Sequence, residues 1–176
     1  RSLLHSGMVG MSAALSIYQI LDAKPLVTDT DGGEVDQLDP TITFDHVVFR
    51  YPGSTDVAHQ DITFDIKAGE RVGVVGSSGS GKSTIMKLLL RLYEPTAGKI
   101  EVGGQDIRDL SFAALRRHMA VVSQDTYLFH GTVEENLRFG KPDATTEELE
   151  IATRNANAHD FISKLPEGYR TVIGER

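Results

Sequence analysis

A chain of 176 residues, of which 40% are hydrophobic, can bury one sizeable core, so we expect one domain with at most an appendage. The net charge of −7 argues against a broad nucleic-acid-binding surface, because such surfaces are strongly basic. The sequence contains no cysteine, which excludes a disulfide framework and a thiolate metal site.

The first segment predicts a helix. Residues 2–21 carry no Asp, Glu, Lys or Arg, and apolar residues recur close to helical spacing at Leu4, Met8, Met11 and Leu15. Several serines interrupt the other faces, which argues against a complete membrane span. Two interpretations remain open: an amphipathic helix packed on a partner, or the cytoplasmic end of a transmembrane helix.

Residues 25–40 predict a linker. They include two prolines, two glycines and five acidic residues, a composition that favours a solvated connector.

From residue 41 the pattern alternates between apolar and polar residues. It predicts strands over 42–49, with a kink near Asp45–His46, over 62–66 and over 99–102. Two β-branched apolar runs, 71–75 and 119–123, are predicted to be buried strands.

The remaining segments predict helices, over 85–92, over 112–118 and repeatedly beyond residue 124. Thr132 with Glu135 three residues later has the pattern of a capping box. Thr145 or Thr146 could cap the next helix, and 160–165 predicts a short final one.

The five histidines beyond residue 40 show no metal-ligand spacing and are expected to be surface or hydrogen-bonded structural residues: His46, His59, His118, His130 and His159.

The most specific motif lies between the predicted strand at 71–75 and the predicted helix at 85–92. Gly76 is followed by four residues and then by Gly81-Lys82-Ser83, which is a phosphate-binding P-loop, or Walker A motif. Glycines let backbone N–H groups turn inward around an anion, and the helix that follows directs its positive end at the phosphates. Lys82 would contact the β- and γ-phosphates, and the Ser83 hydroxyl would bind Mg²⁺.

Further segments carry a family resemblance. Residues 41–176 resemble the nucleotide-binding domain of ATP-binding cassette (ABC) transporters of the exporter type. The segments similar to that family are Phe49–Pro52 (the aromatic A-loop), Leu92–Gly98, Val121–Asp125 (the Q-loop), Leu128–Leu137, Asn157–Ile162, Leu165–Tyr169 and Thr171–Arg176 (the x-loop).

The resemblance implies an α/β fold: a P-loop NTPase (RecA-like) core with an antiparallel β subdomain and part of an α-helical subdomain, incomplete at the C-terminus. Residues 1–24 would extend the last transmembrane helix into the cytoplasm, 25–40 would be the linker, and 41–176 would be the N-terminal part of the nucleotide-binding domain. The implied function is ATP binding in an exporter ATPase that couples hydrolysis to transport. The implied partners are a transmembrane domain and a second, identical or different, nucleotide-binding domain.

The resemblance also implies the ligand contacts. Tyr51 would stack on adenine, and Gln124 would approach Mg²⁺ and the attacking water and sense the transmembrane domain. The residues expected to bind Mg-ATP are Tyr51, Gly76, Ser77, Ser78, Gly79, Ser80, Gly81, Lys82, Ser83, Thr84 and Gln124, with Ser83 and Gln124 near the metal.

The sequence departs from the family at its end. The signature motif, the Walker B aspartate, the catalytic glutamate and the switch histidine do not occur in these 176 residues. We therefore expect no catalytic residue within them, no competent hydrolysis by the chain alone, and poor stability of its unfinished sheet. The alternatives are a non-catalytic nucleotide-binding module and another P-loop enzyme such as a nucleotide kinase.

Overall fold

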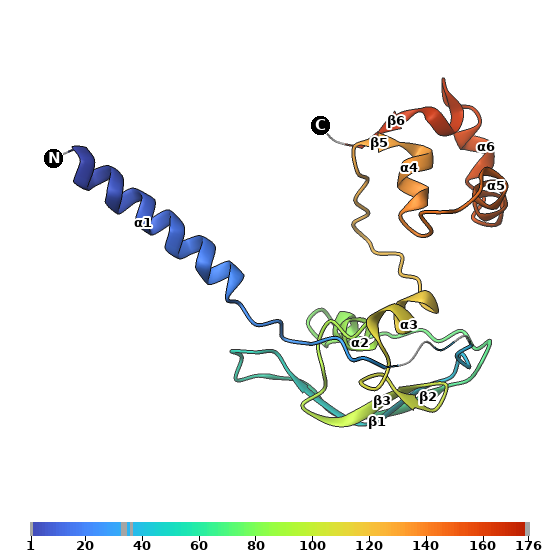
Figure 1. Ribbon diagram of the computed structural model, residues 1–176. Helices are drawn as coiled ribbons and strands as arrows, with labels where there is room; N and C mark the ends of the chain where they lie inside the picture. The colour runs from blue at the N-terminus through green and yellow to red at the C-terminus, as the bar shows by residue number, and fades with distance from the viewer. Residues whose placement is uncertain (1, 33–34, 36, 175–176) are drawn as a thin grey trace. The chain divides into compact units, whose positions relative to one another are not determined.

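The computed structural model describes residues 2–32, 35 and 37–174, and the chain divides into two compact units, residues 1–120 and 121–176. Each unit has its own sheet. The first contains β1 to β4 with α1 to α3, and the second contains β5 and β6 with α4 to α6 (Figure 1).

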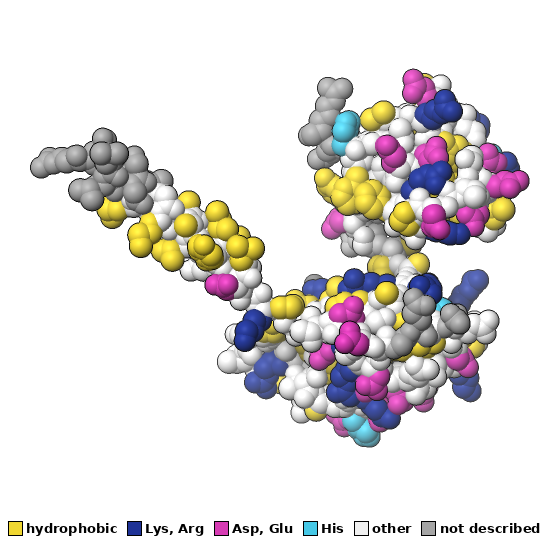
Figure 2. Space-filling model, viewed as in Figure 1, with side chains coloured by type: hydrophobic (Ala, Val, Ile, Leu, Met, Phe, Trp, Pro, Cys, Tyr) yellow, Lys and Arg dark blue, Asp and Glu magenta, His cyan; other side chains and the backbone are white. Residues whose placement is uncertain are grey.

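A helix opens the first unit where the sequence predicts one. This helix, α1, spans Ser2–Leu21, and large apolar side chains along it are exposed, including Met8, Met11, Tyr18 and Ile20. Figure 2 shows that hydrophobic side chains gather along the described part of the helix. Over the described residues, no helix has the length and hydropathy needed to cross a membrane.

An antiparallel four-stranded sheet, in the order β2-β1-β3-β4, forms the floor of the first unit. Its strands are β1 (Ile42–Arg50), β2 (Val57–Ile66), β3 (Ala97–Val102) and β4 (Gln105–Asp106). The predicted kink is confirmed: His46 has a φ of 49°, and the β1–β3 register shifts between Asp45 and Val48. The other two strands expected here are present as well, and β2 begins five residues earlier than predicted.

Two helices, α2 (Lys82–Leu89) and α3 (Phe112–Arg117), cover one face of this sheet (Figure 1). The kink at His46 shifts the alternation of β1 by one residue, so Phe44 before it and Val47 and Phe49 after it all enter the core, where they meet Leu88 of α2 and Leu115 of α3. Each of these side chains is almost fully buried, which stabilises the fold by about 1.5–3 kcal/mol per residue. This packing fixes α2, and with it the start of the P-loop helix, on the sheet.

The two predicted buried strands at 71–75 and 119–123 are wrong for this structure. Neither segment forms a strand, and Val75 and Val122 are 92% and 93% exposed. A strand needs a neighbour for its backbone N–H and C=O groups. Among the described residues, no strand pairs with either segment, so their β-branched composition alone does not produce a ladder.

The linker is also less detached than predicted. Thr30 donates a hydrogen bond to the carbonyl of Leu110, and Asp29 accepts one from the backbone N–H of Phe112. Residues 28–30 are therefore fastened to the first unit, and a purely solvated connector is the wrong description of them.

The second unit is mainly helical, with α4 (Val133–Arg138), α5 (Thr146–Asn155), α6 (His159–Ile162) and a 3₁₀ turn (Gly168–Arg170). A short antiparallel pair, β5 (Gly131–Thr132) and β6 (Val172–Ile173), closes it. The predicted capping box of Thr132 with Glu135 is confirmed, and a second one, Thr145 with Glu148, begins α5. Thr145 rather than Thr146 is the cap of α5.

Candidate functional site

The loop between residues 76 and 81 is a tight turn that relies on its glycines. Gly79 and Gly81 have φ values of 81° and 86°, in the left-handed region that glycine adopts without a steric penalty. The N–H of Ser80 donates to the carbonyl of Ser77 over 3.2 Å, which closes the turn. Gly81 is the N-cap of α2, so the unpaired N–H groups of the first helical turn face the loop.

Lys82 folds back over this loop. Its ammonium group donates to the carbonyl of Gly76 over 2.9 Å and to the carbonyl of Ser77 over 2.6 Å. A cation and the N-terminus of a helix thus meet at one short loop, an arrangement that suits a phosphate chain. Phosphate oxygens would take the place of the two carbonyls as acceptors for the ammonium group.

The aromatic residue expected to contact adenine lies against the P-loop helix. The hydroxyl of Tyr51 is 2.9 Å from Oγ1 of Thr84, a buried residue in the first turn of α2. The Tyr51 ring is half-buried and packs against Phe49 and Tyr93, with ring centroids 4.8 and 5.1 Å away. The fold therefore holds an aromatic ring beside the phosphate loop.

A histidine that the sequence placed among ordinary structural residues lies beneath Gly81. His59 is only 4% exposed, and its Nε2 has no hydrogen-bond partner among the described residues. A Cβ built on Gly81 would lie 2.6 Å from Cε1 of this ring. Burial lowers the pKa of His59, and a backbone contact with Gly81 partly opposes that effect. The expectation of a surface or fully hydrogen-bonded His59 is wrong.

The two residues expected near Mg²⁺ belong to different units. Ser83 lies in the first turn of α2 with an exposed side chain, whereas Gln124 lies in an irregular exposed segment of the second unit. The structure brings Tyr51 and the P-loop residues together within the first unit, and the joint role of Ser83 and Gln124 stays a prediction.

Two buried residues near the site were not assigned a role from the sequence, His59 and Arg91. His59 pairs with the buried Phe49 of β1 through a shift in register, and it is out of phase with the alternation of Ile62, Phe64 and Ile66. Arg91 falls within the predicted helix at 85–92, but in the structure it lies beyond the end of α2 with a φ of 52°. Spacing in the sequence therefore indicates neither the burial of these two residues nor their partners.

Comparison with known proteins gives consistent matches. The family model described as "ABC transporter" matches residues 59–174, more than half of the chain. The chain is 44% identical over 170 residues to "ABC transporter B family member 3" of Dictyostelium discoideum, an alignment that covers 95% of this chain and 12% of that protein. It is 40% identical over 161 residues to the "putative multidrug export ATP-binding/permease protein YgaD" of Bacillus subtilis, with 91% and 28% covered.

Among solved structures, the chain is similar to a bacterial Atm1-family ABC exporter with ATP bound. The TM-score is 0.83 at 36% sequence identity, and the match covers 98% of this chain and 30% of that one. The predicted fold class, a P-loop NTPase with an antiparallel β subdomain and part of a helical subdomain, is confirmed. The chain spans less than a third of each of these proteins.

Proposed function

Because this chain belongs to the ABC transporter family, we propose that it is the Mg-ATP-binding part of an exporter that couples ATP hydrolysis to transport across a membrane. In this proposal residues 1–24 extend a transmembrane helix, 25–40 link it to the nucleotide-binding domain, and that domain begins at residue 41 on the cytoplasmic side of the membrane.

The observation that carries the proposal is the hydrogen bond between Tyr51 and Thr84. P-loops occur in many NTPase classes, but this bond holds an aromatic ring against the first turn of the P-loop helix. The ring can stack on a base while Lys82 and the backbone N–H groups bind the phosphates. A nucleotide kinase has no need of this arrangement.

We propose that Ser83 and Gln124 contact Mg²⁺ that arrives with ATP. A hydroxyl and an amide carbonyl are hard oxygen ligands, which Mg²⁺ prefers, and it usually combines few protein ligands with phosphate oxygens. The exposed position of Ser83 at the start of α2 suits this chemistry. When bound, the metal would neutralise charge on the phosphates.

We propose two protein partners, the transmembrane domain of the same transporter and a second nucleotide-binding domain. The second unit has an apolar hollow of about 590 Å³ whose lining includes Tyr127, Phe129, Phe139 and Phe161. These four aromatic side chains are more than half exposed. Exposed aromatic surface of this kind is typical of a protein contact and supports an association.

The proposal is tested by ATP binding to the purified protein that contains this chain, with the Lys82→Ala variant as comparison. Wild-type protein should bind ATP in the presence of Mg²⁺, and Lys82→Ala should lose at least about tenfold in affinity, because a charge-assisted hydrogen bond is worth about 1.5–3 kcal/mol. Equal affinity of the two proteins would contradict a nucleotide site at this loop.

A further inference from the structure

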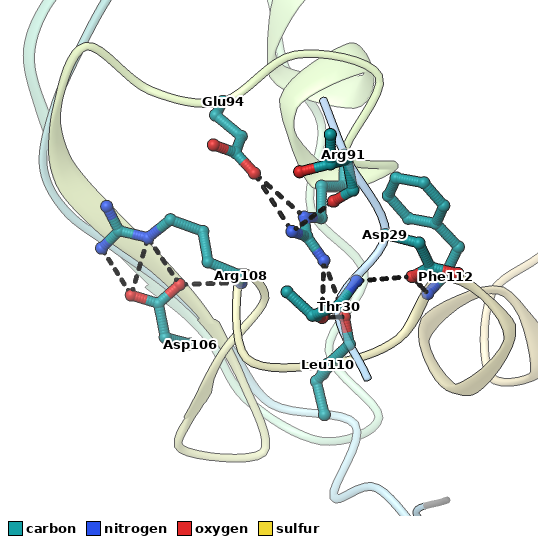
Figure 3. Close-up of polar contacts among 9 residues, drawn as sticks. Asp29, Thr30, Arg91, Glu94, Asp106, Arg108, Leu110 and Phe112 are labelled. Carbon is teal, nitrogen blue, oxygen red and sulfur yellow. Dashed lines mark hydrogen bonds and ion pairs between the residues drawn. The ribbon is translucent and has the colours of Figure 1, made fainter. Parts of the chain in front are cut away.

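Arg91 is a buried charged residue at the end of the P-loop helix. It follows α2, and its side chain is 2% exposed. The guanidinium group makes hydrogen bonds to three separate segments of the chain. Two reach Glu94, one reaches the carbonyl of Leu110 over 2.7 Å, and two reach Thr28 and Thr30 over 3.2 and 3.4 Å (Figure 3).

The linker makes matching contacts of its own, and residues 28–30 are called the linker anchor below. Thr30 donates to the carbonyl of Leu110 over 2.9 Å, the same carbonyl that accepts from Arg91. Asp29 accepts from the N–H groups of Thr30 and Phe112 over 3.0 and 2.7 Å. Figure 3 shows these contacts beside the Arg91 guanidinium, whose carbon lies 5.1 Å from the centroid of the Phe112 ring.

A guanidinium group stays protonated in proteins, so a buried arginine needs all of its acceptors. Its planar fork can reach the linker anchor, Leu110 and Glu94 at once, which the single ammonium of a lysine cannot. Thr30 and Asp29 fasten the linker anchor to Leu110 and Phe112, and Arg91 joins it to the C-terminal end of α2. The N-terminal end of the same helix forms the phosphate loop.

We propose that Arg91 is a positioning residue that couples the P-loop to the linker anchor, so that a bound nucleoside triphosphate and the anchored linker stabilise each other through α2. The inference rests on the nucleotide site proposed above and assigns a role to residues outside that site. Coupling between two sites is reciprocal. If loss of Arg91 reduces the effect of bound nucleotide on the linker by some factor, it must therefore reduce nucleotide affinity by the same factor.

The test is amide hydrogen exchange in the intact protein that carries this chain, with and without Mg-ATP, read at Thr30 and Phe112. In the wild type, Mg-ATP should slow exchange at both amides by about fivefold or more, the lower end of ordinary coupling. Arg91→Met should abolish that slowing and weaken ATP affinity by the same factor. A purely structural role of Arg91 would speed exchange equally with and without ATP.

Two further variants keep the test decisive if Arg91→Met does not fold. Thr30→Val removes the linker hydroxyl that meets Leu110 and Arg91 while preserving side-chain shape, and it should reduce the ATP-linked slowing. Arg108→Met, which removes a half-exposed arginine paired with Asp106 in the same region, should leave the ATP-linked slowing unchanged.

The coupling is overturned if ATP binds but does not slow exchange at the Thr30 and Phe112 amides. It is also overturned if ATP slows exchange equally in Thr30→Val and in the wild type. Failure of wild-type protein to bind ATP at all would overturn the nucleotide site and this inference with it.

Discussion

The hydroxyl of Tyr51 lies 2.9 Å from Oγ1 of Thr84, and this contact joins the turn after β1 to the first turn of the P-loop helix. The two residues are far apart in sequence, and the core packing of β1 against α2 brings them together. The Tyr51 ring also makes edge-to-face contacts with the rings of Phe49 and Tyr93. We therefore expect the ring and the hydroxyl of Tyr51 to have separate effects, which two substitutions can distinguish.

Tyr51→Ala should lower ATP affinity by about tenfold or more, because stacking of a base on an aromatic ring contributes about 1–3 kcal/mol. Affinity for inorganic triphosphate, which has no base, should stay within about twofold of wild type. Calorimetric titration with the two ligands makes this comparison. An equal loss for ATP and triphosphate would show that Tyr51 acts only by shaping the loop.

Tyr51→Phe is the matched control, since it keeps the ring and removes the bond to Thr84. We expect ATP affinity close to wild type and a loss of about 1 kcal/mol in the free energy of unfolding, the usual worth of one such hydrogen bond. If Tyr51→Phe reduces ATP affinity as much as Tyr51→Ala does, the hydroxyl rather than the ring is responsible.

Gly81→Ala should destabilise the loop more than its backbone conformation alone accounts for. Gly81 has a φ of 86°, and a Cβ there would lie 2.6 Å from Cε1 of His59 and 3.0 Å from the carbonyl oxygen of Ala58. Strain at such a φ costs about 1–2 kcal/mol, and the collision adds to it. Urea unfolding and ATP binding should therefore both show a loss.

Gly53→Ala separates these two causes. Gly53 has a similar φ of 78°, but a Cβ there meets nothing within 4 Å. We expect only the conformational cost in this variant, with ATP binding intact. Equal destabilisation by Gly53→Ala and Gly81→Ala would contradict the contact between His59 and the loop.

Local features of this fold were predictable from the sequence because few neighbouring residues determine them. A capping box needs one hydroxyl and one carboxylate three residues apart, and the predicted box of Thr132 and Glu135 is present, as is a cap at Thr145, one of the two threonines expected there. The P-loop depends likewise on glycines at fixed positions, and the kink in β1 occurs at the predicted Asp45–His46 step.

The failures share a non-local cause. Residues 71–75 and 119–123 have strand-forming composition, but a strand forms only where another strand pairs with it, and none among the described residues does. Arg91 and His59 are likewise explained by partners distant in sequence, at Thr28–Thr30 and at Gly81. The spacing of apolar residues indicates which face of a helix or strand is buried, but tertiary packing decides which distant residues contact that face.

Stability should decrease below about pH 6.5 because of His59. Burial holds the pKa of folded His59 below its ordinary value of 6.5, so the unfolded chain takes up a proton first as the pH falls. His59 therefore costs no stability above the unfolded pKa and an increasing amount as the pH falls below it. His59→Leu, which cannot titrate, should flatten the dependence of the urea midpoint on pH in this range.

His46 provides a control of opposite sign. Its Nδ1 lies 2.6 Å from Oδ1 of Asp61, and this hydrogen bond raises the pKa of His46. The stabilising contribution of His46 to folding is present below pH 6.5 and is lost as the pH rises through the raised pKa of the folded state. His46→Asn, which tolerates the left-handed backbone, should steepen the loss of stability at low pH. Identical pH profiles for His59→Leu and wild type would contradict the burial of an uncharged ring beneath Gly81.

Thr145→Ala should destabilise the second unit by about 1 kcal/mol, the typical worth of an N-cap. The Thr145 side chain accepts from the N–H of Glu148, and the Glu148 carboxylate accepts from the N–H of Thr145, so the substitution breaks a reciprocal pair at the start of α5. Thr146→Ala is the control, because this neighbouring threonine is the first residue of the helix and not its cap. There alanine is the better helix former, so we expect no loss or a slight gain in stability. Urea unfolding of the two variants decides between the positions, and a larger loss in Thr146→Ala would show that the cap is placed one residue too early.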